Sequence, residues 1–315
     1  MRYELAPLEG VTTWQFRTAW HRHFTPADKY FTPFVSPNMN QGLNNKERAD
    51  VLPEHNLGLP LIPQILTNRS DYFLATCRDL TEMGYEEVNL NLGCPSGTVV
   101  AKNKGSGFLS EPEALERFLD EIFDQCPLKI SIKTRIGRNS DEEWPRLLDI
   151  YKQYPMTELI VHPRIRKDFY KNTPRREAFQ LAKEVCPFPV TYNGDLFTQK
   201  DIDDFALEFP DAEWVMLGRG AICNPWLLGG TPDIHTLEQF HGELYDGYLK
   251  VMFGDGPTLC KMKGVWAYLI QSFTNYEKYQ KVIRKTRHLS EYTATVNALF
   301  HNEQFIPNTR YCPEK

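Results

Sequence analysis

The chain has 315 residues, of which 41% are hydrophobic and 24% are charged, and its formal net charge is −5. These values are typical of a soluble globular protein, and the length allows one large α/β domain with a smaller second domain. No run of about 18 apolar residues predicts a membrane span, and the N-terminus lacks the charged and then apolar pattern of a secretory signal.

The seven cysteines are scattered, and none of them belongs to a Cys-x-x-Cys pair. An odd and irregular set of this kind argues against a disulfide framework and against a structural zinc site, so we expect no metal. We therefore expect a protein of the reducing cytoplasm.

Short apolar runs rich in β-branched residues alternate with helical patterns along most of the chain. The expected strands are residues 3–8, 29–35, 59–66, 87–92, 129–134, 158–161, 190–192 and 214–217. The expected helices include residues 71–83, 111–124, 142–153, 175–184 and 199–208. Apolar strands joined by helices indicate a parallel sheet buried on both faces, and eight such units fit a (β/α)8 TIM barrel better than an open sheet. The link at residues 36–57 is polar and has no clear helical period.

A cluster of Gly, Thr, Pro and Asp at residues 229–233 interrupts this alternation and is typical of a linker. Beyond it the pattern is helical only, at residues 237–253, 262–273 and 276–288. We therefore expect a barrel domain over residues 1–230, followed by a smaller all-helical C-terminal domain over residues 236–315.

In such a barrel, the catalytic groups lie at the carboxyl ends of the strands. Nearly every expected strand carries a polar or charged residue there, in the order Pro7 to Gly10, Gln64, Asn91 with Cys94, Lys133 with Arg135, His162 with Arg164, Asn193 to Asp195, and Gly218 to Gly220. Each alone has a plain structural explanation, since a strand-end histidine is most often a satisfied core residue. Seven ends with this character together indicate a functional mouth.

Cys94 follows the strand at residues 87–92 and lies in a Gly-Cys-Pro turn. A single cysteine is usually buried filler. At the mouth of a barrel it can instead be a reactive acid or nucleophile, and the strand pattern leaves both readings open.

The last two strand ends have the features of a phosphate site. In TIM barrels, the loops after strands seven and eight and the N-terminus of a short helix bind phosphate. Glycines let backbone N–H groups approach, and Arg219 can bind a phosphate with two hydrogen bonds. The alternative is an ordinary tight turn.

Two segments are strongly basic although the net charge argues weakly against a nucleic-acid partner. Residues 164–176 contain six basic residues and a single acid, Asp168, and residues 278–287 contain five basic residues and no acid. Such segments are either solvated faces or contacts for phosphate groups.

In this order, the motifs resemble those of the tRNA-dihydrouridine synthases, flavoproteins that reduce uridine in tRNA. The resemblance runs from LAPLEGVT at residues 5–12 to the C-terminal helices. Its motifs are NLNLGCP at 89–95, GSG at 105–107, KTR at 133–135, VHPR at 161–164, YNGD at 192–195 and LGRG at 217–220. The run ending in Gly-Cys-Pro is the most specific of them.

The resemblance implies FMN at the barrel mouth and NADPH as the electron donor, with NADH left open because no dinucleotide-binding fingerprint is present. The implied contacts to the ring and ribityl chain are Pro7, Leu8, Glu9, Gln64, Lys133 and His162. Those to the phosphate end are Asn193, Gly194, Asp195, Gly218 and Arg219. The implied reaction forms 5,6-dihydrouridine, with hydride passing from reduced FMN to C6 of uracil and Cys94 protonating C5 as the general acid.

The resemblance also implies a tRNA partner, no protein partner and a monomer. The residues assigned to substrate and tRNA are Asn91, Arg135, Arg164, Arg166, Lys167, Arg175, Arg176, Lys281, Arg284 and Lys285. The glycine-containing segment 96–110 is expected to be a mobile loop that closes over the base, or else an ordinary surface loop. Departures from the family pattern are Pro33, where many members carry an acid, and the segment 163–167, which begins Pro163-Arg164-Ile165 and where a Gly and a Thr are common.

Two other functions stay open. One is a flavin-dependent pyrimidine or enone reductase that acts on a small molecule, and the other is a non-catalytic tRNA-binding protein. The sequence does not indicate which uridine of tRNA is modified.

Overall fold

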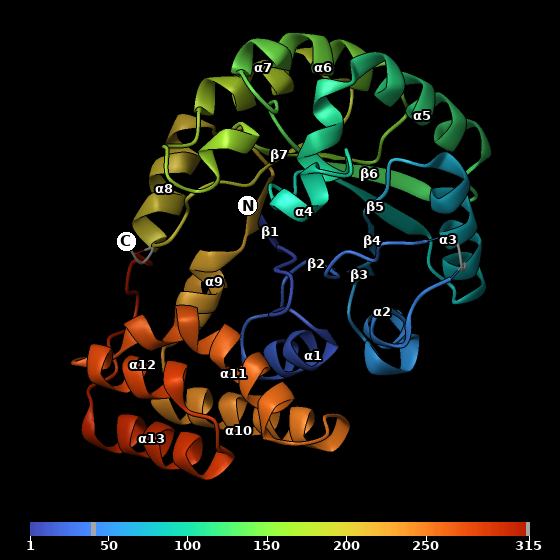
Figure 1. Ribbon diagram of the computed structural model, residues 1–315. Helices are drawn as coiled ribbons and strands as arrows, with labels where there is room; N and C mark the ends of the chain where they lie inside the picture. The colour runs from blue at the N-terminus through green and yellow to red at the C-terminus, as the bar shows by residue number, and fades with distance from the viewer. Residues whose placement is uncertain (39–41, 313–315) are drawn as a thin grey trace. The chain divides into compact units, whose positions relative to one another are not determined.

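The computed structural model describes residues 1–38 and 42–312 (Figure 1). The chain forms two compact units, and each is assembled from three segments. The first unit comprises Met1–Pro7, Lys29–Asp195 and Asp211–Met216, and the second comprises Leu8–Asp28, Leu196–Pro210 and Leu217–Lys315.

The first unit is built on one parallel sheet. Its strands are β1 (Arg2–Leu5), β2 (Lys29–Phe31), β3 (Leu61–Ile62), β4 (Gln64–Ile65), β5 (Glu87–Leu92), β6 (Lys129–Arg135), β7 (Leu159–His162), β8 (Val190–Tyr192) and β9 (Trp214–Leu217). Their order is β3-β2-β1-β9-β8-β7-β6-β5-β4.

The two ends of this order are halves of one strand. Pro63 separates β3 from β4, and proline has no N–H for the ladder. Because β3 pairs with β2 and β4 pairs with β5, the strands close into a ring. The predicted TIM barrel is confirmed.

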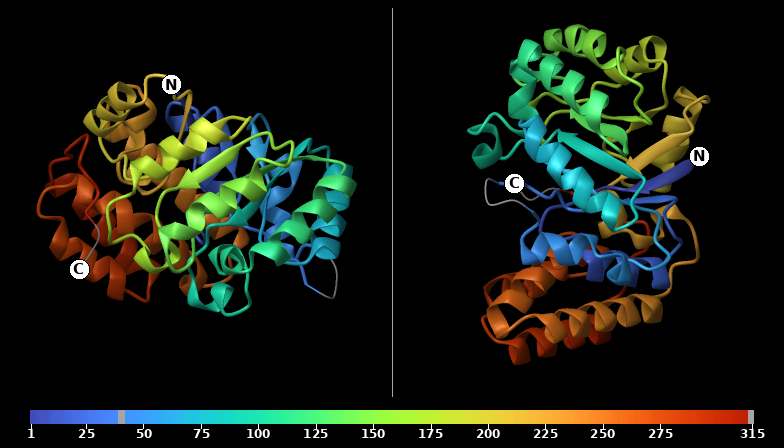
Figure 2. Two further views of the ribbon diagram at one scale, coloured as in Figure 1. Left: turned by 90° about the horizontal axis from the view of Figure 1, so that it is seen from above. Right: turned by 90° about the vertical axis from the view of Figure 1, so that its right-hand side faces the viewer.

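Helices of the first unit lie outside the strands, as α3, α5, α6 and α7 show (Figures 1 and 2). The helices are α2 (Asn45–Val51), α3 (Ser70–Glu82), α4 (Gly97–Val100), α5 (Pro112–Gln125), α6 (Trp144–Tyr151) and α7 (Arg176–Val185). In α5 the buried residues Leu115, Phe118, Leu119 and Ile122 recur at helical spacing and form one apolar stripe. The ring of Phe118 meets that of Phe73 on α3 at 6.0 Å.

The polar link 36–57 contains a helix that its weak apolar pattern did not predict. Asn44 caps α2 by accepting from the Glu47 N–H at 3.0 Å, and the Glu47 carboxylate accepts from the Asn44 N–H at 3.0 Å. This reciprocal capping box starts a helix that buries only Asp50 and Val51. Residues 39–41 of the link lie outside the described residues.

Charged groups fill part of the barrel interior. The Lys29 ammonium lies 2.8 Å from a Glu158 oxygen and 3.3 Å from a Glu4 oxygen. The Thr191 hydroxyl donates to the other Glu158 oxygen. Burial and the neighbouring Glu158 carboxylate raise the pKa of Glu4 well above its usual range. The Glu4 carboxyl is therefore protonated more readily than an ordinary glutamate.

The second unit is helical. It contains α1 (Trp14–His23), α8 (Gln199–Glu208), α9 (Arg219–Cys223), α10 (Ile234–Val251), α11 (Asp255–Leu269), α12 (Tyr276–Lys285) and α13 (Leu289–Asn302). Aromatic rings join the early and late segments, since Phe24 lies 5.0 Å from Trp20 and 4.9 Å from Phe240 on α10. The helical unit therefore also includes chain from before the expected boundary at residue 236.

Both units also contain short 3-10 helices, at Pro53–His55, Gly105–Ser110, Asp141–Glu143, Arg166–Asp168, Pro225–Leu228 and Ile270–Ser272. Within the described ranges 1–38 and 42–312, no helix has the length and hydropathy needed to cross a membrane.

His241 of the second unit is buried and belongs to a chain of hydrogen bonds. The Trp266 indole N–H donates to the Tyr292 oxygen at 2.7 Å, and that hydroxyl lies 2.7 Å from His241 Nε2. The Tyr292 hydroxyl therefore accepts from the indole and also hydrogen-bonds the imidazole. Burial lowers the pKa of His241 to about 4.

This arrangement predicts a loss of stability in acid. The pKa of histidine in an unfolded chain is about 6.5, so below that pH the unfolded state binds a proton that the folded state refuses until about pH 4. Between these values the melting temperature should fall more steeply for the wild type than for His241→Gln, whose amide accepts from Tyr292 without titrating. Exposed His301→Gln is the control, and equal slopes for all three proteins would contradict the assignment.

Candidate active site

The backbone around Cys94 is held from two sides. Asn91 Oδ1 accepts from the N–H groups of Gly93 at 3.1 Å and Cys94 at 2.9 Å. On the other side, Ser106 donates to the Cys94 carbonyl from its N–H at 3.1 Å and from its hydroxyl at 2.8 Å. The half-exposed thiol of Cys94 is therefore carried by a rigid turn at the end of β5.

The segment after Cys94 is folded rather than open. It forms α4 and then the 3-10 turn Gly105–Ser110. Gly105 has φ +54°, and a Cβ there would lie 3.0 Å from the Cβ and carbonyl oxygen of Cys94. Gly105, one of the glycines that suggested a mobile loop, thus serves close packing against the cysteine turn.

A chain of amides fixes the orientation of Asn91. Its Nδ2 donates to Gln64 Oε1 at 2.7 Å, and Gln64 Nε2 donates to Asn89 Oδ1 at 2.8 Å. Asn89 Nδ2 then donates to the Ser131 hydroxyl at 3.0 Å. Because the Asn91 NH2 group is turned to Gln64, its oxygen must face the Cys94 turn. Sequence reasoning found Gln64 and Asn91 but missed Asn89 and Ser131.

Lys133 lies at the end of β6, where its side chain is partly exposed. Its ammonium donates to Asn193 Oδ1 at 2.6 Å, and Asn193 Nδ2 donates to the Met216 carbonyl at 2.8 Å. Burial and the neighbouring Arg135 lower the pKa of Lys133 to about 7, against the opposing charges of Glu4 and Cys94. Lys133 pairs with Asn91 in the register of β5 and β6, so it lies on the strand next to the Cys94 turn.

Arg135 ties three backbone segments together. It is only 1% exposed, and it donates to the carbonyls of Gly93 at 3.0 Å, Ile165 at 2.9 Å and Phe169 at 2.8 Å. Its guanidinium also lies 5.3 Å from the ring of Tyr170. Arg135 was predicted to bind substrate, and the structure shows it joining the Cys94 turn to the loop after β7.

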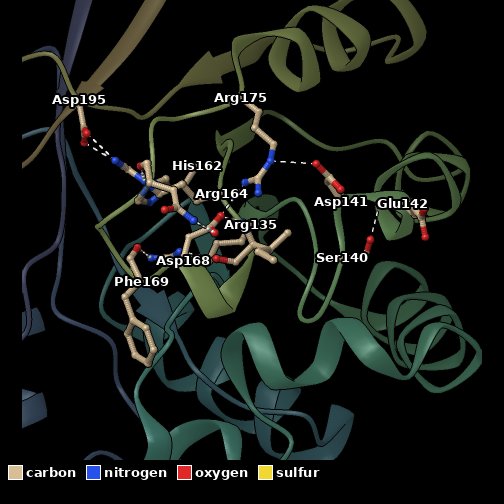
Figure 3. Close-up of polar contacts among 12 residues, drawn as sticks. Arg135, Ser140, Asp141, Glu142, His162, Arg164, Asp168, Phe169, Arg175 and Asp195 are labelled. Carbon is tan, nitrogen blue, oxygen red and sulfur yellow. Dashed lines mark hydrogen bonds and ion pairs between the residues drawn. The ribbon is translucent and has the colours of Figure 1, made fainter.

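Arg164, predicted to contact tRNA, is instead part of a buried network (Figure 3). It is 1% exposed and binds Asp195 through two hydrogen bonds of 2.9 and 2.5 Å. Its Nη1 lies 3.1 Å from His162 Nε2, and a guanidinium can only donate, so His162 Nε2 accepts and its proton sits on Nδ1. Enclosed in this way, Arg164 offers no surface for a phosphate.

Arg175 also pairs within the protein. It lies 2.6 Å from Asp168 and 2.8 Å from Asp141 (Figure 3). Asp168 further accepts from the Ile165 N–H and the Asn172 amide. Burial by itself would raise the pKa of Asp168, but the hydrogen bonds from Arg175, Asn172 and Ile165 outweigh it and lower that pKa. Asp168, the single acid of the basic segment 164–176, therefore holds its loop together through these contacts.

The other predicted cations differ in exposure. Lys167 is exposed, whereas Arg166 and Arg176 are half-buried, with Arg166 over the Phe169 ring at 5.0 Å. Arg176 hydrogen-bonds the Tyr192 hydroxyl. Lys281, Arg284 and Lys285 are all exposed on α12 of the second unit.

The predicted phosphate residues are divided between the units. Asn193, Gly194 and Asp195 belong to the first, where a Cβ on Gly194 would collide with the Tyr192 hydroxyl. Gly218 and Arg219 belong to the second, where Arg219 lies 5.4 Å from the Phe197 ring. Arg310 lies over the same ring at 5.4 Å and pairs with Asp201 at 2.7 Å.

The residues expected at the first strand end are divided in the same way. Pro7 closes the first segment of the first unit, and Leu8 and Glu9 begin the second unit. There the Leu8 N–H donates to the Thr12 hydroxyl at 2.8 Å, and Gly10 has φ +79°. Glu9 is exposed on this turn.

Among residues 1–38 and 42–312, no three His, Cys, Asp or Glu side chains come together in a way that could hold a metal ion.

Residues 4–310 match the family model described as dihydrouridine synthase (Dus). The chain belongs to the dihydrouridine synthase family. The resemblance seen in the motifs is confirmed, and the match covers both units.

Curated relatives carry related names. The chain is 28% identical over 260 residues to a probable tRNA-dihydrouridine synthase of Staphylococcus aureus (strain COL), covering 78% of each chain. It is 26% identical over 227 residues to tRNA-dihydrouridine synthase B of Pasteurella multocida, covering 72% of this chain and 67% of the relative.

Solved structures share the fold at low identity. An old yellow enzyme homologue from Zymomonas mobilis has a TM-score of 0.51 at 11% identity, over 72% of this chain and 87% of that one. Histamine dehydrogenase from Rhizobium sp. 4-9 has a TM-score of 0.53 at 9% identity, over 78% of this chain and 46% of that one. These similarities concern the fold alone and agree with the barrel seen in this chain.

The ion pair between buried Arg164 and Asp195 predicts that Arg164 contributes to the stability of the fold. Arg164→Ala leaves the Asp195 carboxylate without its partner and should lower the free energy of unfolding by about 3 kcal/mol. Lys167→Ala, at an exposed position of the same loop, should change it by less than about 0.5 kcal/mol. Urea denaturation followed by circular dichroism measures both, and a loss from Arg164→Ala no larger than that from Lys167→Ala would contradict the buried role.

Lys133 should titrate far below an ordinary lysine, whose pKa is about 10.4. With a pKa of about 7, its neutral amine forms as the pH rises from 6 to 8. In the ligand-free protein, pulse acetylation with peptide mapping should show Lys133 reacting faster in this range than the exposed lysines. A midpoint above pH 9 at Lys133 would contradict the assigned environment.

Proposed function

We propose that this protein reduces specific uridines of tRNA to 5,6-dihydrouridine, using FMN and NADPH. The observation that carries the proposal is the rigid Cys94 turn beside Lys133 at the carboxyl ends of β5 and β6. The family match and the names of the curated relatives support the same reaction. A cytoplasmic monomer is consistent with it.

The side chains at the mouth fit a flavin. The Lys133 ammonium has three N–H donors and gives one to Asn193, so it can also bind an anionic or carbonyl group. In the proposal, Pro7, Gln64, Lys133 and His162 of the first unit contact the ring and ribityl chain, and Asn193, Gly194 and Asp195 of the same unit hold the phosphate end. Leu8, Glu9, Gly218 and Arg219, which the resemblance also assigns to FMN, belong to the second unit. When bound, reduced FMN, replenished by NADPH, supplies the hydride that C6 of uracil receives.

Saturating the C5–C6 bond of uracil requires a proton at C5 as well as the hydride. In the proposal, the Cys94 thiol donates that proton as the general acid. Asn91 and Ser106 fix its backbone, so the thiol meets the base in one geometry. In the proposal, the Lys133 ammonium, on the strand next to the Cys94 turn, stabilises the thiolate that remains.

A uracil in folded tRNA is stacked and must be turned out to reach this site. Exposed cations suit the phosphates around it, and Lys167, Lys281, Arg284 and Lys285 are exposed. Arg164 and Arg175 are left out of this set because they pair with Asp195 and Asp168.

A Cys94→Ala protein tests the proposal. It should keep its flavin absorbance and its NADPH oxidation, yet form dihydrouridine in unmodified tRNA at least about 100-fold more slowly, because the general acid is lost. Mass spectrometry of nuclease digests measures the product, and the exposed Cys260→Ala protein is the control. Wild-type rates in Cys94→Ala would contradict the acid role. Reduction of free uridine in preference to tRNA by the wild type would point to a small-molecule reductase.

A further inference from the structure

The loop after β7 carries a strained aromatic residue that the proposed chemistry does not use. Phe169 has φ 51° and ψ −98°, in a region that bulky side chains rarely adopt. Strain of this kind costs conformational energy and persists only where the surrounding structure enforces it.

Several contacts enforce this backbone conformation. The Phe169 carbonyl accepts from Arg135 at 2.8 Å, and the Phe169 N–H donates to the Arg166 carbonyl at 3.2 Å. On its two sides, the buried Asp168 carboxylate binds Arg175, and the Lys171 N–H donates to the Asp168 carbonyl at 3.0 Å. The loop therefore holds Phe169 in place although the residue itself disfavours the geometry.

The strain is not offset by burying the ring. Phe169 is 40% exposed and its neighbour Tyr170 is 44% exposed, whereas the arginine that holds them is 1% exposed. Figure 3 shows the Phe169 ring pointing away from the polar network, and the Arg166 guanidinium lies 5.0 Å from it. A buried scaffold thus presents an apolar ring, flanked by a cation, to the solvent.

The position of this ring is coupled to that of Cys94. One guanidinium, that of Arg135, binds both the Phe169 carbonyl and the Gly93 carbonyl next to Cys94. The Tyr170 ring also lies 5.8 Å from that of His162. The Phe169 backbone is therefore held at a fixed place relative to the Gly93–Cys94 turn.

We infer that Phe169 is a stacking platform for an unpaired nucleobase next to the uridine that reacts. This inference rests on the proposed function. Single-stranded bases stack on exposed aromatic side chains, and a cation beside the ring favours the same ligand through the adjacent phosphate. Stacking of this kind tolerates any base, so the platform would hold the RNA without selecting its sequence.

Three variants separate stacking from a structural role. Phe169→Leu keeps an apolar side chain but removes the ring, and should lower kcat/KM for unmodified tRNA about 10-fold or more, mainly through KM. Phe169→Trp keeps a ring and should stay within about threefold of the wild type. Flavin content and NADPH oxidation should be unchanged in both.

Phe169→Gly gives the sharpest contrast. Glycine adopts positive φ without strain, so this variant should melt at a higher temperature than Phe169→Leu while losing as much kcat/KM for tRNA. If the ring had only a structural role, the Phe169 variants would melt at lower temperatures than the wild type and would keep its kcat/KM for tRNA. The control is Phe123→Leu on α5, whose ring stacks on Tyr154 at 5.0 Å and should affect melting but not kcat/KM.

Wild-type kcat/KM and tRNA affinity in Phe169→Leu and Phe169→Gly would overturn the inference. A loss of NADPH oxidation as large as the loss of kcat/KM for tRNA would also overturn the inference, because the ring would then support the cofactor rather than the RNA. Failure of the proposed function is distinguishable, since the wild type itself would then form no dihydrouridine. In that case, tRNA binding by gel shift still tests the platform, and equal affinity of wild type and Phe169→Leu would reject it.

Discussion

The buried guanidinium of Arg135 is the interaction on which the barrel mouth depends. Its three hydrogen bonds join the Cys94 turn after β5 to the loop after β7, and each uses a backbone carbonyl. A charge buried at 1% exposure is stable only when its donors are satisfied. Because Arg135 finds its partners in two different loops, neither loop can move without breaking a charge-assisted bond. The site is therefore rigid before any ligand arrives.

Buried polar side chains of the strands also hold the Cys94 turn in place. The amide chain from Asn91 to Ser131 leaves the Asn91 oxygen only one direction to face, toward the cysteine turn. Deeper in the interior, Lys29 lies between Glu4 and Glu158. An apolar core could give as much stability, but only a satisfied polar network specifies one orientation for each side chain. We interpret the amide chain as the origin of the fixed cysteine geometry.

Much of the architecture could be predicted from periodicity, because buried parallel strands are continuous apolar runs. The strands β5, β8 and β9 lie where the sequence indicated them, β6 is one residue longer at its end, and β7 is shifted by one residue at both ends. The strand expected at residues 59–66 is split at Pro63, whose effect depends on the hydrogen-bond ladder around it. Helix α2 was missed because its capping box, rather than an apolar stripe, defines it.

The sequence by itself determined the family, since the order of its short motifs survives without any knowledge of contacts. It also determined that Cys94, Lys133 and His162 end neighbouring strands of one barrel. Only the tertiary structure decided which cations face solvent. Arg164 and Lys167 are both basic residues of one segment of the sequence. Arg164 is buried because it pairs with Asp195, which follows the neighbouring strand β8. Lys167 is exposed, and no such pair with an acid is seen for it in the described part of the chain. A charged side chain is buried or exposed according to where its counter-charge lies, and that position belongs to the fold.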